Sequence, residues 1–381
     1  MYMPQVLHLS QVLGIILLLM FYISRRNRMG KDSEFYKSKK VDQTLRLREL
    51  ISQLPQPAVD FIYSKEVTTQ ISTRIQYAYD LLTYFRFLQS NNPIIARKDI
   101  KKINTDDLSR VRSEDLMEYQ RFLELNVDEN DPHENGKRAI ARKMSPLRGM
   151  YKYLLTHKQI SEDPTALVEL PRLKKDKNIV RMNSYEVRNI LDAIKNGNNQ
   201  MTERQKNFAE KTRFRDLAIL TLMLNTGIRV SECNGLDIAD INLKDDSFVI
   251  VRKGGAQDVL YFGSYVHEAI NDYLQIERKH ISAREGHEKA LFLSLQGKRM
   301  SVDAIENLVK KYAKIAVPNK KITPHKLRST YGTALYRETG DIRLVADVLG
   351  HENINTTIDY YAAIEDEHKR QARNAVDFNR D

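Results

Sequence analysis

The chain contains the stretch Thr323-Pro-His-Lys-Leu-Arg328 and continues with Leu349-Gly-His351 and Tyr360-Tyr361. Threonine followed by proline is typical of a helix start, which would place His325 and Arg328 on one face in the opening turns. A helix N-terminus with a guanidinium beside it binds anions. The stretch therefore predicts a phosphodiester site that needs no metal, nucleotide or cysteine.

The residues after Arg328 predict that further polar side chains lie close to this anion site. Asp341 is expected to cap a short amphipathic helix, and Gly350 to end it in a left-handed conformation, so that His351 emerges from the turn. Asn355 can cap another short helix, with Tyr360 on its second turn. His351 and Tyr360 are thus expected near the anion site.

A second group of polar residues lies upstream, in Thr226-Gly-Ile-Arg-Val-Ser-Glu232. Its glycine would stop the apolar helix before it and leave Arg229 in a turn between two helices. The apolar run Ser247–Val251 predicts a buried strand, and Asp258–Phe262 predicts a return strand. Lys253 is therefore predicted at the tip of a β-hairpin.

In this order and spacing the residues resemble the tyrosine recombinases, also called phage-type integrases, and among them the Xer-like site-specific recombinases. Each residue taken alone has an ordinary structural interpretation, and it is their joint order that favours the family. The match extends from about Gln43 to the C-terminus. It implies a mainly α fold with a small antiparallel β-sheet, in which a helical, SAM-like core-binding domain precedes an α+β catalytic domain.

The resemblance implies an enzyme, a DNA strand-transferase that works without a metal, ATP or another cofactor. Arg229 and Arg328 would bind the non-bridging oxygens of the scissile phosphate, a bidentate task that suits arginine better than lysine. Tyr360 would attack phosphorus, forming a 3′-phosphotyrosyl intermediate and releasing a 5′-hydroxyl. The covalent link keeps the energy of the broken bond, so that rejoining needs no ATP.

The other catalytic roles implied by the resemblance concern protons and developing charge. Lys253 would be the general acid for the leaving oxygen, His325 would assist proton transfer at the tyrosine, and His351 would hydrogen-bond a phosphate oxygen. Two features depart from the family pattern. Glycines follow Lys253 where further basic residues are frequent, and Tyr361 leaves the nucleophile ambiguous. The nine-residue spacing from His351 favours Tyr360.

Composition favours a nucleic-acid partner. The chain has 381 residues, a formal net charge of +11 and a pI near 9.4, and such a basic surplus favours polyanions, although ribosomal and membrane-surface proteins share it. Its single cysteine, Cys233, excludes an internal disulfide and a cysteine-based zinc site and fits a reducing cytoplasm. Cys233 is expected to be a small packed side chain.

The chain is long enough for more than one domain, and the segment Glu169–Met182 predicts the boundary because it combines a proline with five basic residues. Within it, Lys174 and Lys175 are candidate DNA contacts. The expected organisation is a hydrophobic segment at 1–28, a helical core-binding domain at 29–168, a basic linker at 169–182, and a catalytic domain with its tail at 183–381.

Helical periodicity runs through the region before the linker. Apolar stripes at 75–85, after Ser72 and Thr73, and at 116–123 are typical of amphipathic helices. A third stripe at 137–154 is interrupted by Ser145-Pro146, which predicts two helices with Ser145 capping the second. The polar face of this segment carries basic side chains that could contact DNA phosphates or form a solvated surface: Arg138, Arg142, Arg148 and Lys152.

The N-terminus does not fit the rest of the chain. Residues 1–24 carry no Lys, Arg, Asp or Glu, and the run is just long enough to span a bilayer, with the following arginines on the cytoplasmic side. The alternative is that translation begins at Met29. We favour that alternative, because a membrane anchor would hinder a protein that must encircle DNA.

The expected function is site-specific recombination between two double-stranded DNA sites, by a homotetramer acting in the cytoplasm. Residues 362–381 would either dock into a neighbouring protomer, as in the family, or fray. The alternatives are DNA relaxation of the type IB topoisomerase kind and a non-catalytic DNA-binding protein. The sequence leaves the target site and the biological role open, whether chromosome dimer resolution or integration of a phage or mobile element.

Overall fold

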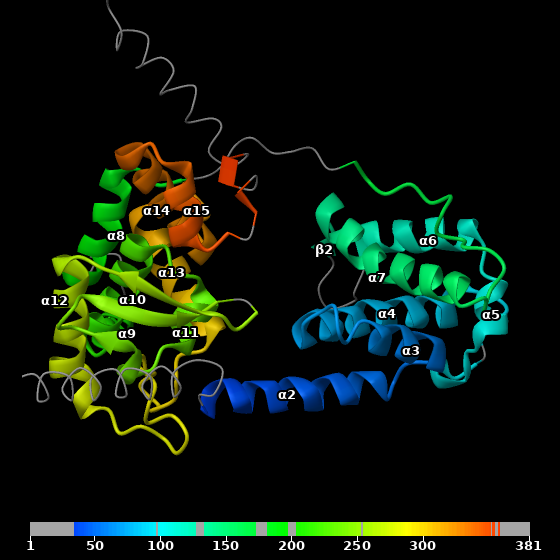
Figure 1. Cartoon of the computed structure of the whole chain (residues 1–381), viewed down its shortest axis with the longest axis horizontal. Coiled ribbons are helices and arrows are strands. Elements are labelled where there is room, and N and C mark those ends of the chain that lie inside the picture. The colour runs from blue at the N-terminus through cyan, green and yellow to red at the C-terminus, as the bar shows by residue number, and fades with distance from the viewer. Residues whose placement is uncertain are drawn as a thin grey trace, which may run out of the picture. The chain divides into compact units, whose positions relative to one another are not determined.

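The computed structural model describes residues 34–96, 98–126, 133–172, 181–196, 203–252, 254–351, 353–354 and 357–358. Within these ranges the chain is mostly helical and has two small antiparallel sheets (Figure 1). It divides into two compact units, one formed by Lys37–Lys175 and the other by Asp176–Asp381 together with Met1–Tyr36. The predicted fold class, mainly α with a small antiparallel sheet, is confirmed.

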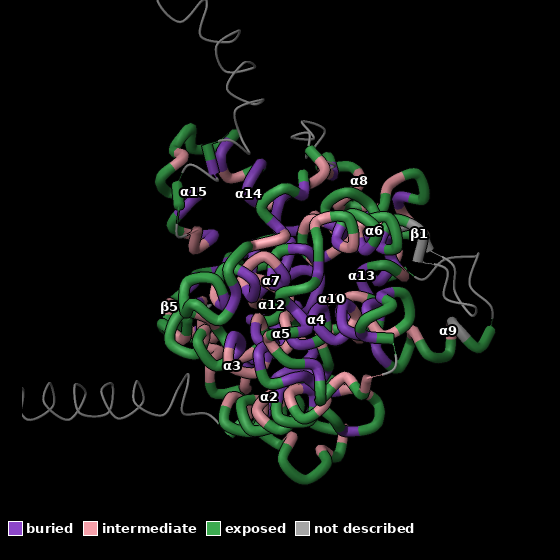
Figure 2. The backbone as a smooth tube through the Cα atoms, turned by 90° about the vertical axis from the view of Figure 1, so that its right-hand side faces the viewer, coloured by how far each residue is buried: buried purple, intermediate pink, exposed green. Residues whose placement is uncertain are grey.

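The unit formed by Lys37–Lys175 is a helical bundle. Its helices are α2 (Glu34–Ile51), most of which belongs here, α3 (Gln56–Ser64), α4 (Ile71–Asn91), α5 (Thr105–Ser109), α6 (Ser113–Glu124) and α7 (Lys137–Thr156), with a 3₁₀ turn at Ile100–Lys102. Strand β1 (Leu125–Asn126) pairs with β2 (His133–Glu134). The long helices α4 and α7 pack against each other, and their apolar residues are buried. Figure 2 colours buried stretches of the backbone purple.

Helix α7 differs from its prediction, because it runs through Ser145-Pro146 without a break. A proline inside a helix removes one hydrogen bond and costs about 3 kcal/mol in isolation. Here Met144 and Leu147, on either side of the proline, are both buried in the core, and Pro146 is buried with them. Packing of one continuous apolar face thus outweighs the local penalty.

The apolar stripes of α4 and α6 are found as predicted, with two exceptions and one shift. Tyr79 and Phe122 are partly exposed rather than in the core. The hydroxyl of Tyr79 accepts a 2.7 Å hydrogen bond from Nε of Arg46, so the ring is covered by a polar partner. Helix α4 also begins earlier than its stripe suggested, because Ser72 and Thr73 lie inside its first turn.

The second unit combines a three-stranded sheet with a larger set of helices. The helices are α8 (Ser184–Asn196), α9 (Glu203–Glu210), α10 (Arg213–Thr226), α11 (Val230–Gly235), α12 (Ser264–Asp272), α13 (Val302–Ala316), α14 (Pro324–Thr339) and α15 (Ile342–Leu349). Single turns lie at Ile238–Asp240, Tyr273–Glu277 and Arg278–His280. Helix α10 is buried nearly all round because α8, α12 and α14 pack on it. Cys233, on α11, is buried as predicted.

The sheet has the order β3-β4-β5 and is antiparallel throughout. Strand β4 (Ser247–Val251) matches the prediction, and β5 (Gln257–Tyr261) begins and ends one residue earlier than expected. In their register Val251 lies opposite Gln257, so the hairpin loop occupies 252–256. The short strand β3 (Ile241–Asn242) was not predicted, because two residues carry no readable periodicity.

Several predictions fall outside the described residues, among them the apolar run at 1–24 and the tail at 362–381. The predicted linker is described only at its ends, where Leu170 packs on the core of the helical unit and Met182 lies in the core of the other. Among the helices of the described ranges, none is both long and apolar enough to cross a membrane.

Candidate active site

The site begins where α10 ends, at a glycine that is required in two ways. Gly227 has a φ of 62°, in the left-handed region, and it ends α10 as predicted. A Cβ added there would lie 2.5 Å from the ring of Tyr331 and 2.8 Å from the side chain of Leu349. The backbone therefore passes close to α14 and α15, and it leads into Arg229 two residues later.

Arg229 is the N-cap of α11, and Glu232 holds it from three residues downstream. The two oxygens of Glu232 accept hydrogen bonds from the Arg229 backbone N–H and from Nη1, each at 2.8 Å. The side chain of Glu232 is 2% exposed, whereas that of Arg229 is 32% exposed. A buried carboxylate thus orients a guanidinium that still reaches solvent. We assigned Glu232 no role from the sequence, although its spacing is that of a capping box.

Helix α14 contributes His325 and Arg328. Thr323 is its N-cap and Pro324 its first residue, as predicted. Arg328 is buried, and its Nη1 donates to the carbonyl of Gly227 at 2.6 Å, while Nη2 donates to the carbonyl of Leu349. Burial, with Arg328 nearby, lowers the pKa of His325, so the imidazole is neutral near pH 7.

The carboxyl end of α15 is the point where the site residues meet. Asp341 caps this helix and Gly350, with a φ of 57°, ends it, both as predicted. Arg229 donates to the carbonyl of Gly350 at 2.8 Å, on the residue before His351. Arg328 donates to the preceding carbonyl, as described above. The last carbonyls of a helix have no partner within it, so these guanidinium groups satisfy them.

His351 leaves this turn and points its Nδ1 at a hydroxyl. Nδ1 lies 2.7 Å from Oγ1 of Thr357, a buried residue. Burial and the nearby guanidinium groups of Arg328 and Arg229 lower the pKa of His351 to about 4. The ring is therefore neutral near pH 7, and its other nitrogen can bind a phosphate oxygen.

The structure thus brings together Arg229, His325, Arg328 and His351. The remaining predicted catalytic residues, Lys253 and Tyr360, lie outside the described residues, as does Tyr361. In the ranges that are described, no three His, Cys, Asp or Glu side chains lie together as metal ligands would.

Comparison with known proteins gives this arrangement a family. Residues 180–368 match the model of the phage integrase family. Tyrosine recombinase XerC of Caldanaerobacter subterraneus subsp. tengcongensis is 36% identical over 309 residues, which are 78% of this chain and 79% of that protein. The chain belongs to the tyrosine recombinase family. Tyrosine recombinase XerD of Staphylococcus saprophyticus is 31% identical to this recombinase over 287 residues, covering 72% of it and 90% of the relative.

A solved structure shares the fold of this recombinase. XerH site-specific recombinase bound to palindromic difH substrate, in a post-cleavage complex, aligns with a TM-score of 0.57 at 18% identity. The alignment covers 87% of this chain and 94% of that one. The predicted Xer-like recombinase identity is confirmed.

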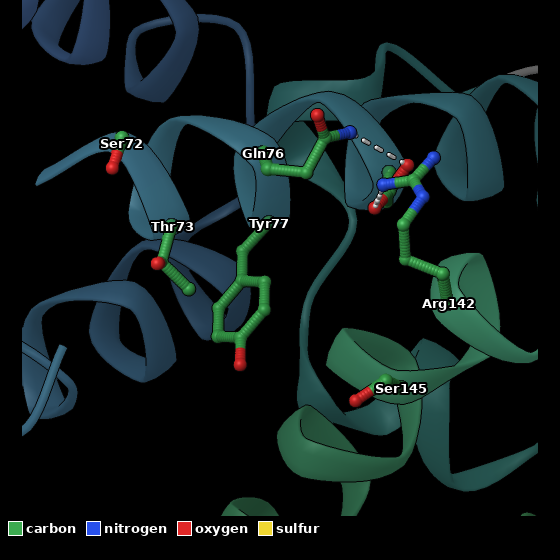
Figure 3. Close-up of a pocket in the computed structure, with 7 residues that line it drawn as sticks. Ser72, Thr73, Gln76, Tyr77, Arg142 and Ser145 are labelled. Atoms are coloured by element: carbon green, nitrogen blue, oxygen red, sulfur yellow. Dashed lines mark hydrogen bonds and ion pairs between the residues drawn. The ribbon is translucent and has the colours of Figure 1, made fainter. Parts of the chain in front are cut away.

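The helical unit of the recombinase has a polar pocket between α4 and α7 (Figure 3). Its volume is about 440 Å³, and hydrogen-bonding side chains line it: Ser72, Thr73, Gln76, Tyr77, Asp80, Arg142 and Ser145. Asp80 is buried, accepts from Arg142 Nη1 at 2.7 Å, and lies 3.7 Å from Lys143. Burial raises the pKa of the Asp80 carboxyl, and Arg142 and Lys143 lower it in part.

The side chains of α7 that were predicted to contact DNA differ in their exposure. Arg138, Arg142 and Lys152 are exposed. Arg148 differs, because it is half-buried and donates to the carbonyl of Val168, which ties the segment after α7 to the helix. Its position on the polar side of the stripe could not reveal this distant partner. Lys174 and Lys175 lie outside the described residues.

Proposed function

We propose that this tyrosine recombinase cleaves and rejoins DNA at specific sites through a covalent 3′-phosphotyrosyl intermediate. The observation that carries the proposal is the meeting of Arg229, Arg328 and His351 at the carboxyl end of α15. Family membership supports the reaction, and the relatives give no support for a topoisomerase or a non-catalytic DNA-binding protein.

The two arginines bind the scissile phosphate. In the absence of DNA, Nη2 of Arg229 and both Nη atoms of Arg328 donate to backbone carbonyls, which are neutral acceptors of the kind that a phosphate oxygen can replace. A phosphate accepts charge-assisted bonds that are shorter and stronger than those to a carbonyl. Glu232 keeps Arg229 oriented while this exchange takes place. As negative charge builds in the transition state, both guanidinium groups stabilise it.

Proton transfers accompany the attack. Tyr360 gives up its hydroxyl proton, with His325 assisting, and its oxygen bonds to phosphorus. The bond from phosphorus to the 5′-oxygen breaks, and Lys253 donates the proton that this oxygen needs. His351, neutral in the DNA-free protein, hydrogen-bonds a phosphate oxygen, and the bound anion raises its pKa. Attack by a new 5′-hydroxyl reverses the sequence and frees the tyrosine.

The domain plan and assembly follow the family. A core-binding domain at 29–168 and a catalytic domain at 183–381, joined by a basic linker at 169–182, would close around the duplex. Four protomers would hold two sites in the cytoplasm, with residues 362–381 docked in a neighbour. XerH in complex with difH supports a DNA partner for this architecture.

DNA contacts from the helical unit centre on Arg142. It is half-exposed at the edge of the polar pocket, and Asp80 fixes its orientation (Figure 3). Arg138 and Lys152, exposed on the same helix, would reach phosphates, and Lys174 and Lys175 would extend the track along the linker.

The test uses DNA that the protein itself selects. Duplexes bound from a random-sequence pool are rebuilt with a nick beside the cleavage point, so that the released fragment diffuses away and the covalent complex accumulates. Denaturing electrophoresis should show an adduct for the wild type and for Tyr361→Phe, and none for Tyr360→Phe. An adduct lost only in Tyr361→Phe would reassign the nucleophile. No adduct for the wild type on a tightly bound duplex would make the chain a non-catalytic DNA-binding protein.

A further inference from the structure

Arg252 has no assigned role, yet it connects the elements of the site. It follows strand β4, and its side chain is 10% exposed. Its Nη2 donates to the carbonyl of Val348 at 2.8 Å, and Nη1 lies 3.5 Å from the carbonyl of Leu349. Nη1 also lies 3.5 Å from Oε1 of Glu232, the oxygen that binds Arg229.

The edge of the same guanidinium formed by Nε and Nη2 also binds the second strand of the hairpin. Nε and Nη2 of Arg252 donate to Oδ2 of Asp258 on strand β5, at 3.0 and 2.8 Å. The backbone N–H of Arg252 donates to the carbonyl of Ala256 at 2.8 Å, so both backbone and side chain fix the root of the loop. Lys253 is the next residue in the sequence.

The position of α15 depends on such polar ties. The described apolar cluster around α15 is small, consisting of Tyr336, Val345 and Leu349 with a few partly buried neighbours. Of the residues of α15, only the partly buried Val348 packs against the main core. The end of the helix is pressed against Arg252, because a Cβ at Gly350 would lie 2.7 Å from its Cζ. A guanidinium has donors on several edges, so one side chain can hold three elements in register.

We infer that Arg252 is a positioning residue for strand cleavage, which holds the Gly350-His351 turn and the Arg229–Glu232 pair in register with the hairpin of β4 and β5, between which Lys253 lies in the sequence. The inference rests on the recombinase function proposed above. Displacement of a reacting group by about 1 Å can slow a reaction by about 100-fold without weakening binding. Arg252 touches no substrate in this account, since its partners are protein groups.

A second arginine of the same unit supplies the matched control. Arg299 is also largely buried, donates to the carbonyls of Asn234 and Leu236 at 3.1 and 2.7 Å, and pairs with the carboxylate of Asp237. None of these partners is a proposed catalytic residue. Arg252→Lys and Arg299→Lys therefore remove the same kind of guanidinium hydrogen bonds. The first removes them beside the candidate active site, and the second removes them elsewhere in the same unit.

The experiment measures single-turnover cleavage of the selected nicked duplex by the full chain, with DNA affinity and thermal melting measured on the same samples. We expect Arg252→Lys to cleave about 10-fold to 100-fold more slowly at saturating DNA, with affinity unchanged within about threefold. Arg299→Lys should melt earlier but cleave at the wild-type rate.

Two results would overturn the inference. One is a wild-type cleavage rate in Arg252→Lys. The other is a loss of cleavage rate in Arg299→Lys as large as that in Arg252→Lys, which would make Arg252 a general stabilising residue. An absent adduct in the wild type is a different failure, since it removes the proposed function and this inference with it. Asp258→Asn, which loosens only the hairpin edge, should slow cleavage less than Arg252→Lys does.

Discussion

Arg328, at the carboxyl end of α15, and Arg142, beside Asp80 in the helical unit, are held by different partners. Arg328 donates to the backbone carbonyls of Gly227 and Leu349 and is buried. Arg142 donates to a buried carboxylate on α4 and is 47% exposed. The same side chain is thus placed in one region against neutral backbone dipoles and in the other against a full charge.

We expect this difference in partners to suit Arg328 to the cleavage reaction and Arg142 to DNA binding. A carbonyl can be exchanged for a phosphate oxygen with a gain in hydrogen-bond strength, and the buried site keeps water away while this happens. A carboxylate is not displaced by an anion, so we expect Asp80 to stay in place and Arg142 to offer its remaining donors to DNA. We expect substitutions of the arginines at the end of α15 to change the rate of DNA cleavage. Substitution of Arg142 should instead change the affinity for DNA and its dependence on salt.

The largest effect should come from the catalytic side, in Arg229→Lys. Lysine cannot reproduce the paired donors that Glu232 orients, so we expect cleavage to slow by about 100-fold, or about 2.7 kcal/mol of activation free energy, with little change in affinity. Single-turnover cleavage on the selected duplex measures it. Arg213→Lys, at an exposed arginine that stacks on Phe214, should cleave normally. Equal cleavage rates for both variants would contradict the proposal that Arg229 binds the scissile phosphate.

Gly350→Ala should have the next largest effect, because it disturbs the turn on which the arginines meet. Alanine at a φ of 57° is strained, and its Cβ would collide with Arg252, so we expect about 1 to 2 kcal/mol of lost stability and slower cleavage. Gly340→Ala has a similar φ of 64° but meets nothing within 4 Å. It should lose stability from strain alone and cleave normally. Thermal melting and the cleavage assay distinguish the two.

Arg142→Gln tests the binding side of the comparison. We expect affinity to fall several-fold, by about 1 kcal/mol, and the slope of log affinity against log salt to become shallower by about one. Cleavage at saturating DNA should be unchanged. Arg148→Gln is the control, because its guanidinium is bound to the Val168 carbonyl and should affect stability instead. If Arg148→Gln changed the salt slope as much, the contrast between these two arginines would be wrong.

The smallest expected effect is on the pH dependence of stability. His351 has a pKa of about 4 in the folded protein, below its ordinary 6.5. Between these values the unfolded chain binds a proton that the folded chain does not, so stability falls as the pH is lowered through this window. Urea unfolding should show a shallower decline in His351→Gln than in the wild type, whereas His280→Gln, at an exposed histidine, should match the wild type. Identical declines in all three would argue against a depressed pKa.

Local signals in the sequence were sufficient for the ends of the helices that carry the site. Thr323-Pro324, Asp341 and the two glycines at 227 and 350 mark those ends with residues whose own conformations determine the geometry. Such signals act over a few residues. The order of the catalytic residues was then enough to identify the family.

Partners distant in sequence could not be predicted. Arg252 meets Val348 across 96 residues, and Arg148 meets Val168 across 20, and neither contact leaves a periodic trace. Helix α7 is a second example of this limit on prediction from sequence. Its tertiary packing keeps the helix continuous through Pro146, although a proline locally favours a break. Sequence patterns thus led to the predicted catalytic residues, but not to the side chains that contact the described ones among them.

The buried cysteine has a practical consequence for observing this protein at work. Burial raises the pKa of the Cys233 thiol to about 12, and a thiol that is neither exposed nor ionised reacts very slowly with alkylating dyes. Because it is the single cysteine of the chain, a fluorophore could be attached to a new surface cysteine without first removing the native one. Replacing an exposed residue on each unit in turn would then permit fluorescence measurements on each unit with and without a duplex.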